Sequence, residues 1–372
     1  MKLLKLKLEL KDTFRSLPKD FNISFHPDLE SKYINPICFI GPNGSGKSNV
    51  LEVLVEIFYY LDSLHLDYGE KNLSKSKKFG FEIVYEIPIT FANAIGTIGE
   101  QSNNFSNSFR KVLIKKPYDK EPKYYYTDGE SEEKEVSKKE DRKKLLPTKI
   151  VGYSSGLNEL LSNPFIKMRF HYFNEYEKKV KDEIFDRIED SRLVFMDYDA
   201  NSTILIANYL MQEDVLEPLI EQTKIETIYS FRISLQLKDY RNREVILTPK
   251  LKEDIDKLKK CSTTFNDERS KKSCTLTLDY LVDDQTKKAF QYHFASSAFE
   301  LFQTLQSLEL LNTHRLKVTK RDGIRRAGRG TNISDQIPQP DSSELVFKIE
   351  DLTLNISKLE NSIKYKNISD GE

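Results

Sequence analysis

The chain has 372 residues, 31% of them charged and 38% hydrophobic, which is typical of a globular protein with a sizeable core. Its 58 basic and 58 acidic residues balance, so the net charge indicates no class of partner. No run approaches the roughly 18 apolar residues of a membrane span. The three cysteines form no C-x-x-C pair, which favours reduced thiols of a cytoplasmic protein over a zinc site.

Alternating hydrophobicity predicts several strands in the first part of the chain. Two strands are expected at residues 4–10 and 22–26, before a third at 79–87 that places alternate apolar side chains on one face. Shorter strands are expected at 112–114 and 124–126. Residues 128–144 carry mixed charge and offer no apolar face, so we expect an exposed, partly disordered loop there.

Residues 37–60, ICFIGPNGSGKSNVLEVLVEIFYY, combine three local patterns. The apolar run at 37–40 predicts a buried strand, and a glycine-rich turn follows at 41–46. From Val50 onward, apolar residues recur at helical spacing. The turn together with Lys47-Ser48 matches G-x-x-x-x-G-K-S, the P-loop motif for nucleotide phosphates, in the strand–loop–helix context that the motif requires.

Phosphate binding explains these residue types. Glycines let the loop fold tightly enough for successive N–H groups to point at phosphate oxygens. We expect Lys47 to lie along the β- and γ-phosphates of ATP and the Ser48 hydroxyl to bind Mg²⁺. The start of the following helix adds partial positive charge. The predicted site comprises Gly41, Pro42, Asn43, Gly44, Ser45, Gly46, Lys47, Ser48 and Asn49.

The next elements lead towards a second candidate for metal binding. A strand is expected at 148–153 with a polar turn at 154–158, and a charged helix at 165–184. Four apolar residues at 193–196 predict a short strand that ends at Asp197, where a second nucleotide motif would place a metal-binding aspartate. A helix is expected at 202–213.

The rest of the chain is expected to form an insertion within the ATPase head, followed by a strand that returns to the head. Strands are expected at 229–237 and 274–282, a charged helix at 249–260, and one long amphipathic helix at 285–311, whose apolar stripe is typical of a core. A final strand is expected at 345–354. The basic segment 314–330 is a candidate for nucleic-acid contact, or alternatively a solvated loop. Its basic residues are Arg315, Lys317, Lys320, Arg321, Arg325, Arg326 and Arg329.

The last residues, NISDGE at 367–372, resemble the signature motif L-S-x-G-E/Q of ABC-type ATPases. With GPNGSGKSN and the pair of strands before it, the chain resembles the SMC/RecF-like branch. That branch includes bacterial AAA family ATPases associated with restriction and anti-phage defence. The alternative for this segment is a capped turn, because Ser369 is a good N-cap and Asp-Gly a common turn pair.

The resemblance implies a homodimer in which two heads hold ATP between them. Ser369 and Gly371 of one copy would approach the γ-phosphate bound at Lys47 of the other. It also implies a later strand with the catalytic glutamate, which would lie beyond Glu372. We therefore expect a truncated head that binds ATP but hydrolyses it slowly or not at all. Alternatively, Asp197 supplies the metal-side aspartate.

The glutamine-bearing loop of the family is not identifiable from the sequence. Gln101 is one candidate for its glutamine, and the turn at 154–158 is another place where the loop could lie.

These expectations give an α/β protein with a P-loop NTPase, ABC-ATPase-like head. Residues 1–200 would form the ATPase lobe with an antiparallel β subdomain, 201–344 a mixed α+β insertion, and 345–372 the return strand and the start of the signature. The expected function is an ATPase head that couples ATP-dependent dimerisation to a nuclease or other effector in nucleic-acid processing or anti-phage defence. A non-hydrolysing switch or scaffold, and a P-loop kinase or motor that uses Asp197, are the alternatives.

Overall fold

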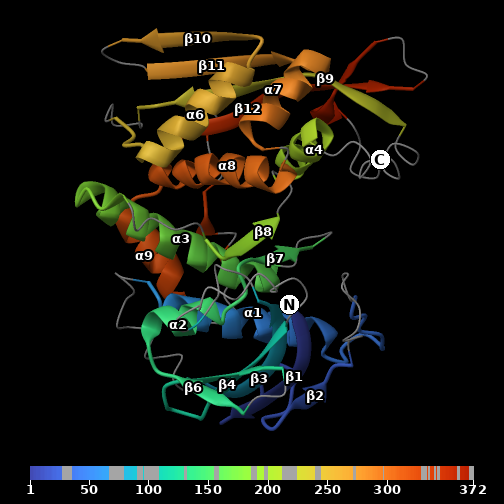
Figure 1. Cartoon of the computed structure of the whole chain (residues 1–372), viewed down its shortest axis with the longest axis vertical. Coiled ribbons are helices and arrows are strands. Elements are labelled where there is room, and N and C mark those ends of the chain that lie inside the picture. The colour runs from blue at the N-terminus through green and yellow to red at the C-terminus, as the bar shows by residue number, and fades with distance from the viewer. Residues whose placement is uncertain are drawn as a thin grey trace. The chain divides into compact units, whose positions relative to one another are not determined.

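A computed structural model describes most of the chain (Figure 1). The described residues are 1–26, 36–66, 79–89, 95, 109–129, 132–154, 159–185, 191–196, 200–211, 224–238, 244–270, 274–295, 297–327, 333, 336–338, 341, 344–357 and 361–367. The chain divides into two compact units, each with an antiparallel sheet. The first contains Met1–Gly152, Asn158–His171 and Ser191–Val194, and the second contains Tyr153–Leu157, Tyr172–Asp190 and Phe195–Glu372.

The first unit is built on a six-stranded antiparallel sheet in the order β2-β1-β3-β4-β5-β6. Its strands are β1 (Lys2–Leu10), β2 (Asn22–Ser24), β3 (Phe79–Pro88), β4 (Phe109–Lys116), β5 (Lys123–Asp128) and β6 (Lys134–Val136). Successive side chains of a strand point to opposite faces, so the alternation read from the sequence puts one apolar face on the core. In β3 that face carries Phe79, Phe81, Ile83, Tyr85 and Ile87, all buried as predicted.

Helix α1 (Lys47–Ser63) covers the apolar face of this sheet (Figure 1). Val53, Ile57 and Leu61 are fully buried in the same cluster as Leu6 and Leu8 of β1. Each fully buried aliphatic side chain contributes roughly 1.5–3 kcal/mol. Packing of this one stripe therefore fixes where the helix, and the loop before it, lie relative to the sheet.

Three further helices and two further strands follow before the second sheet. They are α2 (Lys139–Lys144), α3 (Glu159–Lys181) and α4 (Ala200–Met211), with β7 (Ile150–Tyr153) and β8 (Leu193–Met196) forming a two-stranded sheet. No helix among the described residues is long and apolar enough to cross a membrane.

The second unit contains a five-stranded antiparallel sheet in the order β10-β11-β9-β12-β13. Its strands are β9 (Ile225–Gln236), β10 (Thr264–Arg269), β11 (Cys274–Leu281), β12 (Phe347–Ile356) and β13 (Ile363–Lys364). One face packs on α4, α6 (Pro249–Cys261), α7 (Asp284–His293) and α8 (Ala298–Leu310) (Figure 1). The elements η5 (Leu311–Arg315), α9 (Val318–Arg326) and η8 (Tyr365–Asn367) complete this unit.

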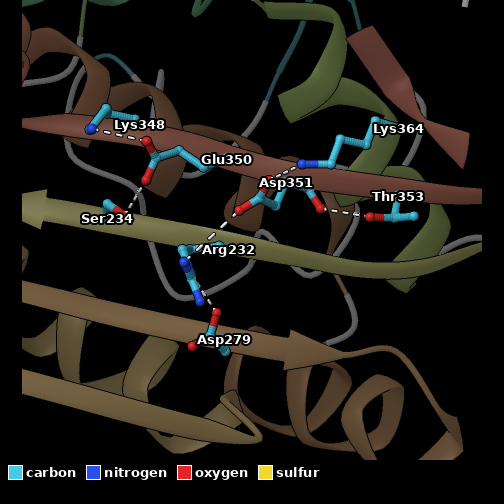
Figure 2. A network of polar contacts seen from close by, with 8 residues as sticks. All are labelled: Arg232, Ser234, Asp279, Lys348, Glu350, Asp351, Thr353 and Lys364. Carbon is cyan, nitrogen blue, oxygen red and sulfur yellow. Dashed lines mark hydrogen bonds and ion pairs between the residues drawn. The ribbon is translucent and has the colours of Figure 1, made fainter. Parts of the chain in front are cut away.

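The other face of this sheet carries a network of charged side chains (Figure 2). Arg232 of β9 forms a hydrogen bond of 2.6 Å to Asp279 of β11 and lies 3.9 Å from Asp351 of β12. Glu350 accepts hydrogen bonds from Ser234 at 2.6 Å and from Lys348 at 2.9 Å. Because each charge has a partner on its own or a neighbouring strand, we interpret the network as a device that fixes strand register.

The fold class is thus mixed α/β with antiparallel sheets, and most predicted elements are present. The last long strand of the chain joins the sheet of the second unit. The predicted return strand at 345–354 is β12, and it pairs with β9 in the sheet of the second unit. Residues 347–356 therefore share a sheet with part of the predicted insertion.

The predicted buried strand at 37–40 is absent. Residues 36–40 have no regular secondary structure, and the Ile40 side chain is 95% exposed. A strand needs a neighbour to pair its backbone groups, and none of the described residues supplies one here.

The predicted long helix at 285–311 is two helices, α7 and α8, separated by residues 294–297. The predicted loop at 128–144 contains β6 and α2. The sequence did not indicate these two elements because the segment has few apolar residues. Those that hold it to the core, Val136, Leu145 and Leu146, are all buried.

Candidate functional site

The glycine-rich turn at 41–46 leads directly into α1, as the motif predicts. Gly44 and Gly46 have φ angles of +81° and +90°, which L side chains rarely adopt. The Ser45 N–H donates to the Pro42 carbonyl at 3.3 Å, which closes the turn. These positive φ values give the loop the reversal that brings Lys47 back across residues 41 and 42.

Lys47 lies inside the curve of this loop. Its ammonium donates to the carbonyl oxygens of Gly41 at 2.7 Å and Pro42 at 2.8 Å, and lies 3.5 Å from the Ser45 hydroxyl oxygen. A cation held by neutral carbonyls is in a position to exchange them for anionic oxygens, because an ammonium is attracted more strongly to an oxygen of opposite charge than to a neutral one.

The start of α1 is suited to a negative ligand. Its N-cap is Gly46, which has no side chain with which to cap the first N–H groups, and the first turn contains no acidic residue. The first four N–H groups of a helix lack intrahelical partners, and they carry the positive end of the helix dipole. An anion at this position would satisfy those donors.

Ser48 and Asn49 complete the predicted set, and they have different surroundings. The Ser48 residue is exposed, which suits a metal ligand that also needs room for water. Asn49 instead donates from Nδ2 to Ser16 Oγ at 2.7 Å. Asn49 is therefore engaged by the turn between β1 and β2.

That turn contributes residues that sequence reasoning missed. Arg15 forms a two-pronged ion pair with Glu52 of α1, with distances of 2.5 Å from Nε and 2.9 Å from Nη2 to the two carboxylate oxygens. The available signal was a lone acidic residue within the apolar first half of α1, four positions after Ser48. Its partner lies 37 positions away in the sequence, so no local pattern identifies it.

Several predicted site residues lie outside the described part of the chain. These are Asp197, Ser369, Gly371, Gln101 and Arg329. Their roles remain predictions from the sequence. Among the described residues, no group of three or more His, Cys, Asp and Glu side chains is arranged to hold a metal ion.

The basic segment is a structured helix over much of its length, and neither the predicted basic surface nor the solvated loop describes it fully. Arg321 in α9 is 1% exposed, its guanidinium binds Glu177, and it lies 4.6 Å from the centre of the Phe173 ring. Arg325 binds Asp322 at 2.5 Å. Both arginines are therefore committed to contacts within the second unit and do not present charge to a nucleic acid.

The remaining described cations of this segment differ in exposure. Lys317, Lys320 and Arg326 are exposed, whereas Arg315 is half-buried and donates to the Pro338 carbonyl at 2.7 Å. The predicted basic surface is thus reduced to three exposed side chains in the described part of the segment.

No protein-family model matches the chain, and no curated protein matches it by sequence.

Proposed function

We propose that residues 41–49 bind the phosphates of ATP together with Mg²⁺, and that the chain is the ATP-binding head of an ABC-type ATPase. The observation that carries the proposal is the position of the Lys47 ammonium, which bridges the Gly41 and Pro42 carbonyls inside the loop. When a triphosphate enters, this ammonium exchanges two neutral acceptors for charged ones.

Each neighbouring residue has a role in the proposed complex. The free N–H groups at the start of α1 receive phosphate oxygens, and Gly44 and Gly46 allow the backbone to approach them. Ser48 supplies a hydroxyl oxygen, a ligand type that Mg²⁺ accepts alongside water and phosphate. Bound Mg²⁺ would neutralise part of the phosphate charge.

The test is the substitution Lys47→Ala, measured by equilibrium binding of a fluorescent ATP analogue with and without Mg²⁺. We expect binding to weaken by at least about tenfold, the equivalent of roughly 1.4 kcal/mol. The matched control is Lys238→Ala. The Lys238 ammonium also donates to a backbone carbonyl, that of Ser270 at 3.0 Å, and lies in the second unit. Equal affinity in wild type and Lys47→Ala would overturn the proposal.

We further propose that ATP joins two copies of the head, with Ser369 and Gly371 of one copy opposite Lys47 of the other, and that this dimer acts on an effector in nucleic-acid processing or defence. Resemblance to the ABC signature supports this step. Ser369→Ala should abolish ATP-dependent dimerisation in sedimentation experiments while leaving monomer affinity intact. If Asp197→Ala abolishes Mg²⁺-dependent binding and Ser369→Ala does nothing, the kinase or motor alternative replaces the ABC assignment.

Hydrolysis distinguishes an ATPase from a non-hydrolysing switch. We propose that the head is an ATPase, and release of inorganic phosphate would measure this activity directly. ATP-dependent dimerisation without phosphate release would instead identify a switch or scaffold.

Among the described residues of the basic segment, contact with nucleic acid is proposed through the exposed cations Lys317, Lys320 and Arg326. Replacing all three with glutamine should weaken duplex DNA binding and reduce its dependence on salt. The slope of log K against log salt is negative, and each lost phosphate contact reduces its magnitude by about 0.9. Arg321→Gln would not report on this surface, since its guanidinium binds Glu177. Unchanged binding and an unchanged slope in the triple variant would remove nucleic acid as a partner of this segment.

A further inference from the structure

The turn between β1 and β2 contains a two-residue reversal beside the glycine-rich loop. Phe14 and Leu17 exchange backbone hydrogen bonds of 3.0 and 2.9 Å, which leaves only Arg15 and Ser16 at the tip. Phe14 and Leu17 are both buried in the core of the first unit. The backbone of the tip is therefore held in place, which fixes the positions from which the Arg15 and Ser16 side chains extend.

Arg15 adopts a backbone conformation that is unfavourable for a residue with a side chain. Its φ is +54°, at the first tip position of a two-residue reversal, where glycine is the usual residue. A non-glycine residue with positive φ persists when surrounding contacts outweigh the strain, and such residues gather at functional sites. The relevant contact here is made by the arginine side chain.

That contact ties Arg15 to a buried carboxylate on α1. Glu52 is 6% exposed, and both of its oxygens receive hydrogen bonds from the guanidinium, at 2.5 and 2.9 Å. Glu52 lies four residues after Ser48, so the two share one face of the helix. Arg15 thus offsets the negative charge nearest to the predicted phosphate site on α1.

Two further contacts link the same turn to the first turn of α1. Ser16 Oγ accepts a hydrogen bond of 2.7 Å from Asn49 Nδ2. A methyl group on Gly46 would lie 3.0 Å from Ser16 Oγ and 3.1 Å from Leu17 Cδ2, so the backbone of the N-cap residue lies directly against the turn. Gly46, Asn49 and Glu52 are therefore all held by residues 15–17.

We propose that residues 14–17 form a brace that holds the P-loop in its phosphate-binding conformation, with Arg15 and Ser16 as positioning residues that act through Glu52, Asn49 and Gly46. The expected effect of the brace on ATP affinity rests on the proposed function. The expected effect of the brace on the loop conformation does not, because these contacts are present before any nucleotide binds. The brace reduces the conformational freedom that the loop would otherwise lose on binding.

The test uses two variants of the brace and a matched control elsewhere in the first unit. Arg15→Gln removes the charge and the fork, and Ser16→Ala removes only the acceptor for Asn49. The control is Arg110→Gln, because Arg110 forms a similar two-pronged pair with Asp128, with distances of 2.7 and 3.0 Å, on strands β4 and β5. Arg15→Lys and Ser16→Thr are the conservative variants that should recover part of each loss.

Two readouts separate positioning from general stability. In the nucleotide-free protein, hydrogen exchange of the amides at 44–49 should accelerate by about five- to tenfold in both brace variants and stay near wild type in the control. Affinity for the fluorescent ATP analogue should fall by a similar factor in the brace variants only. Melting temperature is measured in parallel, and we expect Arg15→Gln and Arg110→Gln to lower it to similar extents.

The outcomes distinguish the inference from the proposed function. Suppose that wild type binds ATP, that the brace variants bind it equally well, and that hydrogen exchange at 44–49 is unchanged. The proposal of a brace is then wrong, and the proposed ATP site is unaffected. If wild type does not bind ATP, the proposed function fails, and the exchange measurement alone decides whether the brace holds the loop. If Arg15→Gln does not fold, Ser16→Ala carries both readouts.

Discussion

At the level of single residues, Gly46 shows how strictly the glycine-rich turn at 41–46 limits its own sequence. Its φ of +90° and the contacts of 3.0 and 3.1 Å that a methyl group would make with Ser16 and Leu17 both oppose any side chain. We expect Gly46→Ala to destabilise the first unit by roughly 1–3 kcal/mol and to abolish ATP binding.

A second glycine provides the contrasting control. Gly323 lies in α9, has no atom within 4 Å of where a methyl group would be placed, and has no positive φ. Gly323→Ala should therefore stabilise the protein by about 0.5–1 kcal/mol. Urea unfolding of both variants measures these effects, and equal destabilisation by the two substitutions would contradict the explanation.

His65 gives the molecule a defined sensitivity to acid. Burial, together with Lys143, Arg192, Lys139 and Arg142, lowers the pKa of His65 from 6.5 to about 3. Among the described residues neither ring nitrogen has a hydrogen-bond partner. Between pH 6.5 and 3 the unfolded state binds more protons at this histidine than the folded state does, so its effect on stability is an increasing loss as the pH falls.

The slope of this loss is up to about 1.4 kcal/mol per pH unit. His65→Phe keeps a ring of similar shape but cannot be protonated. Urea unfolding from pH 7 to pH 4 should therefore show a shallower decline for the variant than for wild type. Parallel declines would show that His65 does not contribute.

At the scale of elements, the break between α7 and α8 is set by a local cap. The Ser297 hydroxyl accepts a hydrogen bond of 3.2 Å from the Glu300 N–H and begins α8, while Ala295 in the connection has a φ of +49°. Apolar spacing continues across the break because both helices bury side chains in the same core. The sequence S-x-x-E at 297–300 is a capping-box pattern and was the signal that periodicity concealed.

We expect Ser297→Ala to destabilise the second unit by about 1 kcal/mol because the start of α8 loses its cap. Ala295→Gly should leave the stability of the second unit unchanged or raise it, since glycine adopts positive φ without strain. Thermal unfolding followed by circular dichroism measures both. A stabilising Ser297→Ala would mean that α7 and α8 are able to join into one helix.

At the scale of the whole molecule, two units with separate cores predict a local response to nucleotide. A ligand that binds only the native state stabilises it by RT ln(1 + [L]/Kd), about 2.7 kcal/mol at one hundred times Kd. With Mg²⁺ and ATP, amides of α1, β1 and β3 should exchange more slowly, while those of β9 and β11 in the second unit keep their rates. Exchange mass spectrometry tests this prediction, Lys47→Ala should remove the protection, and protection confined to β9 and β11 would contradict the site.

Sequence reasoning succeeded where neighbours in the chain decide the structure. Alternation identified β1 and β3 with their buried faces, and helical spacing after Lys47 identified α1. The same reasoning failed at 37–40, because an apolar run becomes a strand only when another strand pairs with it. It also expected the cations of the basic segment to lie either on a nucleic-acid surface or in a solvated loop, whereas the buried Arg321 binds Glu177 and lies over the Phe173 ring.

The glycine-rich turn could be recognised without a structure, because its glycines and the lysine at the helix start act through backbone geometry within a few residues. Which residues support that turn, and which charges are exposed to a partner, depends instead on contacts between distant parts of the chain. The pairs Arg15–Glu52 and Arg321–Glu177 join residues 37 and 144 positions apart. The physical reason is that burial and charge pairing depend on which surfaces the folded core brings into contact, and local periodicity carries no information about contacts at that distance.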